Sequence, residues 1–211
     1  MVDREAIARA LIQTPDTLPQ AEQEQPRFII RTATDALAPQ PPIPWVIDGV
    51  FPPGLSVVAG GFGSKKTWAM IDAAICVAMG KPWLNHPTKQ TTALYIDEEM
   101  GAGFIGQRIG SVIRGEMGNA DTPILYSSLS MLNLLQKGEA EHLEAIIRAT
   151  CAGFVVIDSL VSVTPGADEN TVKDMQPVLN ALKKVAKDTE SSIVLVHHAN
   201  KIGNYRGTTA I

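Results

Sequence analysis

The chain has few cysteines and no excess of positive charge. Only two cysteines, Cys76 and Cys151, occur among 211 residues, and 75 positions separate them. They offer no metal-ligand spacing, so we expect two buried thiols in a reduced, cytoplasmic setting. The 18 Lys and Arg residues against 22 Asp and Glu residues leave a net charge of −4. This balance excludes nucleic-acid binding through bulk positive charge, so any such contact must come from local basic loops.

Long hydrophobic runs are also absent. The longest apolar stretch, from Trp68 to Met79, contains Asp72 and is too short to span a bilayer. The first ten residues carry acids and lack the apolar stretch of a secretory signal. We therefore expect a cytoplasmic protein with no membrane partner. Hydrophobic residues make up 45% of the chain and charged residues 19%, which suits one α/β domain with an appendage.

The sequence changes in character near residue 43. Residues 1–42 are polar, and we expect an N-terminal extension with one short helix over 3–12, followed by a linker. Six of the 14 prolines lie between Pro39 and Pro53, which excludes a central strand or a helix there. We expect Trp45, Ile47 and Phe51 to anchor this segment to a domain over 43–211.

Short apolar runs alternate with helical patterns from Leu55 onward. The alternation predicts an α/β fold with a mostly parallel sheet and helices on both faces, because the strands are apolar throughout rather than on alternate residues. Pro177 predicts a kink or a late start in the last helix. The expected strands are 55–59, 91–97, 124–128, 153–158 and 192–198, and the expected helices are 66–79, 139–150 and 171–187.

A glycine-rich turn follows the first of these strands and opens a helix, as a P-loop does. Its glycines allow backbone amides to surround a phosphate, and the helix N-terminus adds partial positive charge. Lys66 is placed to reach the β- and γ-phosphates of ATP, and the Thr67 hydroxyl to bind Mg²⁺. Lys65 stands where the pattern requires glycine, and the alternative is a turn with two solvated lysines. The expected nucleotide-binding residues are Gly60, Gly61, Phe62, Gly63, Ser64, Lys65, Lys66, Thr67 and Trp68.

Acids and histidines end three later strands. Asp158 follows four apolar residues and is placed to hold Mg²⁺, although a lone acid there is usually a helix cap. The run 97–99 carries three carboxylates, which repel one another unless a cation or a proton transfer uses them; the alternative is a solvated loop. His197 and His198 are candidates for core groups, carboxylate partners or a γ-phosphate sensor, and zinc is not expected because no further Cys or His pair lies nearby.

Together these elements resemble the RecA-like ATPases, and most closely the RepA-type hexameric replicative DNA helicases of plasmids and phages. The resemblance covers about residues 43–211. It depends on WVIDGVFPPGLSVVAGGFGSKKTW, on ALYIDEEM with Arg108 nine residues past Glu99, on VVIDSL, and on VLVHHANKIGNYRGTTAI. It implies a RecA-like P-loop NTPase that uses ATP and Mg²⁺ to unwind or translocate on DNA in replication.

The resemblance also implies roles for single residues. Glu99, rather than Asp97 or Glu98, is implied as the catalytic base, with Lys66 on the phosphates. His197 or His198 is implied as the sensor, and His198 is preferred. Arg206 is implied to lie at a subunit boundary of a homo-hexamer, near a neighbour's ATP.

Partners follow from the same resemblance. Lys201 and the loop through Tyr205 are implied to face a central channel that grips single-stranded DNA, together with the loop 161–170. The family usually continues past Ile211 into further strands, so we expect a truncated chain or a fragment of a longer one, with a primase module before the linker as a further possibility. The rival hypotheses are a catalytically weak ATP-binding module for assembly or regulation, a P-loop kinase of a small molecule, and a recombinase-type or clock-type relative.

Overall fold

The computed structural model describes residues 29–168 and 171–198, and its contacts divide the chain between Pro42 and Ile43. Before that point lies the short helix α2 (Ala33–Leu37), in a segment where the sequence prediction had only a linker. Thr32 and Asp35 form a reciprocal capping box that starts this helix, and none of its residues is buried. The helix expected over 3–12 lies outside the described residues.

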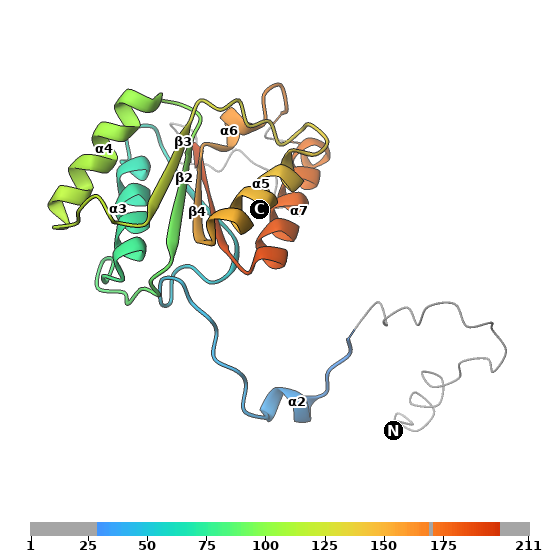
Figure 1. The fold of residues 1–211 in the computed structure, drawn as a ribbon. Coiled ribbons are helices and arrows are strands. Elements are labelled where there is room, and N and C mark those ends of the chain that lie inside the picture. The colour runs from blue at the N-terminus through green and yellow to red at the C-terminus, as the bar shows by residue number, and fades with distance from the viewer. Residues whose placement is uncertain (1–28, 169–170, 199–211) are drawn as a thin grey trace, which may run out of the picture. The chain divides into compact units, whose positions relative to one another are not determined.

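The larger unit contains a sheet of five parallel strands (Figure 1). In spatial order these are β1 (Gly54–Gly60), β5 (Ser192–His198), β4 (Ala152–Asp158), β2 (Thr92–Asp97) and β3 (Ile124–Ser128). All four strand pairings are parallel, which confirms the predicted α/β class. Strands buried on both faces need side chains that are apolar on both faces, and this explains the continuous apolar runs of the sequence.

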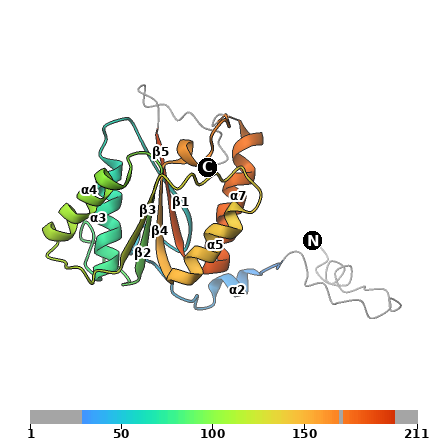
Figure 2. The same ribbon diagram turned by 45° about the horizontal axis from the view of Figure 1, so that its top comes forward.

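Helices cover both faces of the sheet (Figure 2). The helices α3 (Lys66–Met79) and α4 (Ala102–Gly115) lie on one face, and α5 (Glu139–Thr150) and α7 (Val172–Thr189) lie on the other. The single-turn helix α6 (Leu160–Val163) follows β4. Each face has its own core cluster, in which the alternate side chains of β4 divide between the two: Phe154 and Val156 pack on one side, and Val155 and Ile157 on the other.

The sequence prediction differs from the structure at three points in this unit. It missed α4, which buries only Ile105 and Ile109 and therefore has a narrow apolar face. For the last helix it offered a kink or a late start, and the late start is excluded because α7 begins at Val172 and continues through Pro177. It expected two buried thiols, but Cys151 is exposed because it ends α5 in a left-handed conformation at the surface; Cys76 is buried.

The proline-rich segment before β1 is anchored as expected by two of its three apolar residues. Ile47 is fully buried, and Phe51 is 5% exposed, whereas Trp45 is only half-buried. The ring of Phe51 stacks on Trp83 with 6.1 Å between centroids and also contacts Phe154 of β4. These contacts tie the segment to the core. Among the described residues, no helix is both long enough and apolar enough to cross a membrane.

Candidate nucleotide-binding site

The candidate site lies at the carboxyl edge of the sheet, where parallel strands bring their last residues together. Asp97 at the end of β2 is in register with Asp158 at the end of β4. On the strand next to β4, His198 at the end of β5 is in register with Gly60 at the end of β1. The strand that leads into the P-loop and the strand that ends in Asp158 are therefore separated by β5, which places the two histidines between them.

The P-loop connects β1 to α3, as the sequence predicts. The ammonium group of Lys66 donates hydrogen bonds to the carbonyl oxygens of Gly60 at 2.7 Å and Gly61 at 3.1 Å. Lys66 is only 9% exposed, because its side chain lies back over the loop. An ammonium on carbonyl oxygens is well placed to exchange them for the oxygens of a phosphate, which carry a full negative charge.

Lys65 departs from the pattern in its backbone as well as in its side chain. Its φ is 65° and its ψ is 21°, in the left-handed region that favours glycine. The Lys65 side chain is exposed, so it is free of the steric contacts that a buried residue would meet there. At the tip of the loop Phe62 is 90% exposed, and Trp68 in the first turn of α3 is 38% exposed. The Arg108 guanidinium of α4 lies 5.1 Å from the centre of the Trp68 ring.

Asp158 is buried beneath the start of α3 and accepts hydrogen bonds from two hydroxyl groups. The hydroxyls of Thr67, at 2.8 Å, and Tyr95, at 2.7 Å, both donate to its Oδ2 atom. Burial raises the pKa of the Asp158 carboxyl, and the charge of Glu99 adds to this, while the Tyr95 and Thr67 donors lower it. Burial and the charge of Asp158 raise the pKa of Tyr95 above its usual range, so the phenol keeps its proton and donates.

Oxygen atoms suited to a magnesium ion meet at this point. Oδ1 of Asp158 is buried and has no hydrogen-bond partner within 29–168 and 171–198, although a buried carboxylate oxygen normally has one. The Thr67 hydroxyl contacts the other oxygen of the same carboxylate. Ligand atoms of Glu99, Asp158 and His198 lie within 4.8 Å of one another. Carboxylate and hydroxyl oxygens are the ligands that Mg²⁺ prefers, so this set of residues fits that ion.

The structure gives the three adjacent acids at the end of β2 different surroundings. Asp97 is fully buried and accepts hydrogen bonds from the backbone amides of 99–101 and from the Ser128 hydroxyl. Glu98 turns to the other side and accepts hydrogen bonds from the backbone amides of 130–132, at 3.1 to 3.4 Å. These two carboxylates therefore hold the segments that follow β2 and β3. The amide and hydroxyl donors offset the repulsion among the three carboxylates that the sequence suggested.

Glu99 is the acid that joins Asp158 in the site. Its Oε1 atom accepts a hydrogen bond from the hydroxyl of Ser159, the residue after Asp158. The same oxygen lies 2.9 Å from Nε2 of His198. The side chain of Glu99 is 31% exposed, so it is held in place and yet open to solvent. His197, the other candidate histidine, is 1% exposed and belongs to the buried part of β5.

Two contacts in the site involve residues that the sequence reasoning did not single out. Tyr95 and Ser159 reach Asp158 and Glu99, respectively. One signal for Tyr95 was available, because it carries a hydroxyl within the apolar run 93–96 and stands two positions before an acid. The predicted positions Lys201, Tyr205 and Arg206 lie outside the described residues.

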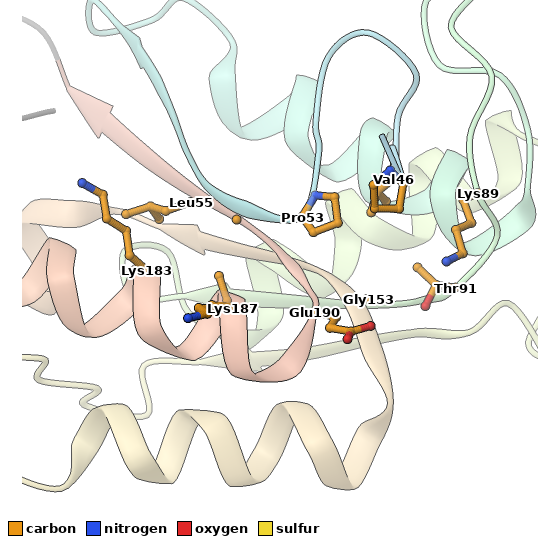
Figure 3. A pocket seen from close by; sticks show the side chains of 12 residues that line it. Val46, Pro53, Leu55, Lys89, Thr91, Gly153, Lys183, Lys187 and Glu190 are labelled. Atoms are coloured by element: carbon orange, nitrogen blue, oxygen red, sulfur yellow. The ribbon is translucent and has the colours of Figure 1, made fainter. Parts of the chain in front are cut away.

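A hollow of about 510 Å³ lies at the opposite edge of the sheet (Figure 3). Gly54 and Gly153, at the starts of β1 and β4, line it together with Lys89, Lys187 and Glu190. None of the predicted nucleotide-binding residues lines this hollow. The candidate site is thus defined by the P-loop and the strand ends rather than by this cavity.

The parallel sheet, the P-loop and the acids at the strand ends define a P-loop ATPase of the RecA-like class. The family model described as the AAA domain matches residues 21–204, and the chain belongs to this family. Membership implies ATP binding and general ATPase activity. No curated protein matches the chain.

Proposed function

We propose that this chain is an Mg²⁺- and ATP-dependent motor domain that hydrolyses ATP to unwind or translocate on DNA in replication, as a homo-hexamer. The observation that carries the hydrolytic part is the meeting of Glu99, Asp158 and His198 within 4.8 Å beside the P-loop. The DNA-dependent part rests on the resemblance of the strand-end and C-terminal motifs to the RepA-type helicases.

Binding of ATP is the task of the loop 60–67. Its backbone amides and the N-terminus of α3 would bind the phosphates, and Lys66 would exchange its carbonyl partners for phosphate oxygens. Thr67 and Asp158 are the residues that would hold Mg²⁺, because their oxygens meet at a buried point with one carboxylate oxygen unpartnered. The ion, when bound, neutralises negative charge on the phosphates.

Glu99 acts in this proposal as the base that orients water and accepts its proton. Ser159 and His198 both contact Oε1, which leaves Oε2 for the water. A base held in this way keeps its position while it takes a proton from the attacking water. Arg206 of a neighbouring subunit would stabilise charge on the γ-phosphate, an effect worth about 10³- to 10⁵-fold in related ATPases and GTPases. Lys201 and the loops 161–170 and 199–207 would grip single-stranded DNA.

A second candidate function is an ATP-binding module for assembly or regulation that turns ATP over slowly. The left-handed Lys65 favours it, because a side chain now occupies the position next to the phosphate lysine that the P-loop pattern reserves for glycine. A small-molecule kinase finds less support, since the segment 160–170 carries neither Arg nor Lys for a phosphate-binding lid.

ATP hydrolysis measured with and without single-stranded DNA separates these functions. If the protein is a motor, single-stranded DNA should stimulate hydrolysis and Glu99→Gln should abolish it. Lys201→Ala should lose the stimulation by DNA but keep the basal hydrolysis. ATP binding without turnover, with or without DNA, would reject the motor and support the assembly module. Turnover that depends on a small phosphate acceptor instead of DNA would support the kinase.

A further inference from the structure

Tyr95 is a buried residue of β2 whose hydroxyl contacts the acid at the end of the neighbouring strand β4. It stands on β2 in register with Val156 of β4, two positions before the register pair Asp97 and Asp158. Its ring lies in the apolar core cluster under α3 and is 0% exposed. Its hydroxyl donates to Oδ2 of Asp158 at 2.7 Å. A phenol buried this deeply loses its water, and this hydrogen bond offsets that cost.

The two oxygens of Asp158 are used differently. Oδ2 accepts both the Tyr95 and the Thr67 hydroxyl, whereas Oδ1 is buried without a partner among the residues that the structure describes. The last torsion of an aspartate side chain has a broad energy minimum, so the side chain alone does not determine how the carboxylate plane is turned toward the site. Two donors on one oxygen do determine it, because rotation would break both hydrogen bonds.

We propose that Tyr95 is a positioning residue for the metal-binding acid: its hydroxyl anchors Oδ2 of Asp158 from the core side and keeps Oδ1 turned toward the cation. This inference rests on the proposed magnesium site at Thr67 and Asp158, and not on the proposed action on DNA. Thr67 stands in the first turn of α3, and its hydroxyl is itself a proposed ligand of the ion, whereas Tyr95 belongs to a strand of the sheet. The hydrogen bond from Tyr95 is therefore the one that holds Asp158 independently of the ion.

Tyr95→Phe removes the hydroxyl and leaves the apolar ring, so it isolates this contact. The affinity for a non-hydrolysable ATP analogue is measured in EDTA and in saturating Mg²⁺. The affinity in Mg²⁺ divided by the affinity in EDTA is the metal gain. We expect this gain to fall about 10-fold or more in Tyr95→Phe, as is typical when a group that orients a metal ligand is lost. The affinity in EDTA is expected to stay within twofold of the wild type.

Tyr126→Phe is the matched control. Tyr126 stands on β3 directly opposite Tyr95 in the register and is 47% exposed. Within 29–168 and 171–198, its hydroxyl is not among the groups that hydrogen-bond to Thr67, Glu99 or Asp158. The same loss of one hydroxyl there is expected to leave the metal gain unchanged. Replacing Tyr95 with 4-aminophenylalanine restores a donor at the same place and is expected to recover most of the gain.

Asp158→Asn distinguishes failure of this inference from failure of the proposed metal site. It should abolish the metal gain, and Tyr95→Phe added to it should cause no further loss if Tyr95 acts through Asp158. A wild-type protein without a metal gain, or an Asp158→Asn variant that keeps it, would overturn the metal site and this inference together. A loss in Asp158→Asn but none in Tyr95→Phe would overturn only the role of Tyr95. Equal losses in EDTA and in Mg²⁺ would also overturn that role, because they indicate a merely structural residue.

Discussion

Nε2 of His198 lies 2.9 Å from Oε1 of Glu99, although 99 positions separate the two residues in the chain. His198 ends β5 beside the last residue of the P-loop strand, and Glu99 follows β2 on the far side of β4. The contact therefore spans the candidate site from the nucleotide loop to the acid. It gives Glu99 a neighbour on the strand that pairs with the P-loop strand.

Glu99→Gln should stop hydrolysis without preventing ATP binding. The amide keeps a carbonyl oxygen for Ser159 and His198 but has no basic oxygen to take a proton from water. We expect kcat to fall by about 10²- to 10⁴-fold, the usual contribution of a general base. Single-turnover hydrolysis and equilibrium binding of ATP measure the two effects separately. A variant that hydrolyses ATP at the wild-type rate would exclude Glu99 as the base.

Glu98→Gln tests the adjacent acid and should affect stability rather than chemistry. The Glu98 carboxylate accepts three backbone amides of 130–132, and the neutral amide of glutamine is a weaker acceptor. We expect the free energy of unfolding in urea to fall by about 1 kcal/mol. The hydrolysis rate should stay within a few-fold of the wild type. A rate loss as large as that of Glu99→Gln would contradict the division of roles between the two acids.

Lys65→Gly should stabilise the nucleotide-free protein. The left-handed backbone at Lys65 costs a residue with a side chain about 1 kcal/mol, and glycine does not bear this cost. For a protein of this size the gain corresponds to a rise of about 2–4 °C in the melting temperature. Lys65→Ala is the control, because it removes the charge and keeps the backbone cost. An equal rise in both variants would attribute the effect to charge instead of conformation.

Asp72→Asn should make stability depend less on pH. Burial of Asp72 in α3 raises its pKa, and the charge of Glu116 adds to this, while the Trp83 donor lowers it. A raised pKa means that the folded protein binds this proton more tightly than the unfolded chain. The wild type therefore loses stability as pH rises above the ordinary value of 3.8, and the asparagine variant does not share this loss.

Urea unfolding between pH 4 and pH 7.5 measures this difference. The advantage of Asp72→Asn should grow as pH rises and then level off. Asp188→Asn is a control of opposite sign, because the hydrogen bond from Lys184 lowers the pKa of Asp188. The disadvantage of Asp188→Asn should be small, because the pair is exposed, and nearly constant over this range, because a lowered pKa costs stability only below the ordinary value of 3.8. A pH-independent difference for Asp72→Asn would show that its carboxyl is not perturbed.

Much of the fold could be predicted from local pattern. The strand 153–158 and the helix 66–79 differ by no more than one residue at either end from β4 and α3, because their composition is consistent with their final surroundings. The helix α4 was missed because its apolar face consists of few residues and it contains several glycines. Burial of Cys151 was predicted wrongly because its apolar neighbours in sequence belong to a strand, whereas Cys151 itself stands in the turn before it.

The sequence by itself determined the class of the protein. A glycine-rich turn between an apolar strand and a helix, with later strands ending in acids, has a local chemical meaning that needs no knowledge of contacts. Only the tertiary structure decided which groups each acid meets. Asp97, Glu98 and Glu99 are neighbours of the same type in sequence, but their distant donors differ: Ser128 at the end of β3 for Asp97, backbone amides of 130–132 after β3 for Glu98, and Ser159 after β4 for Glu99. Strand order brings these donors together across long sequence separations, as it brings Tyr95 to Asp158.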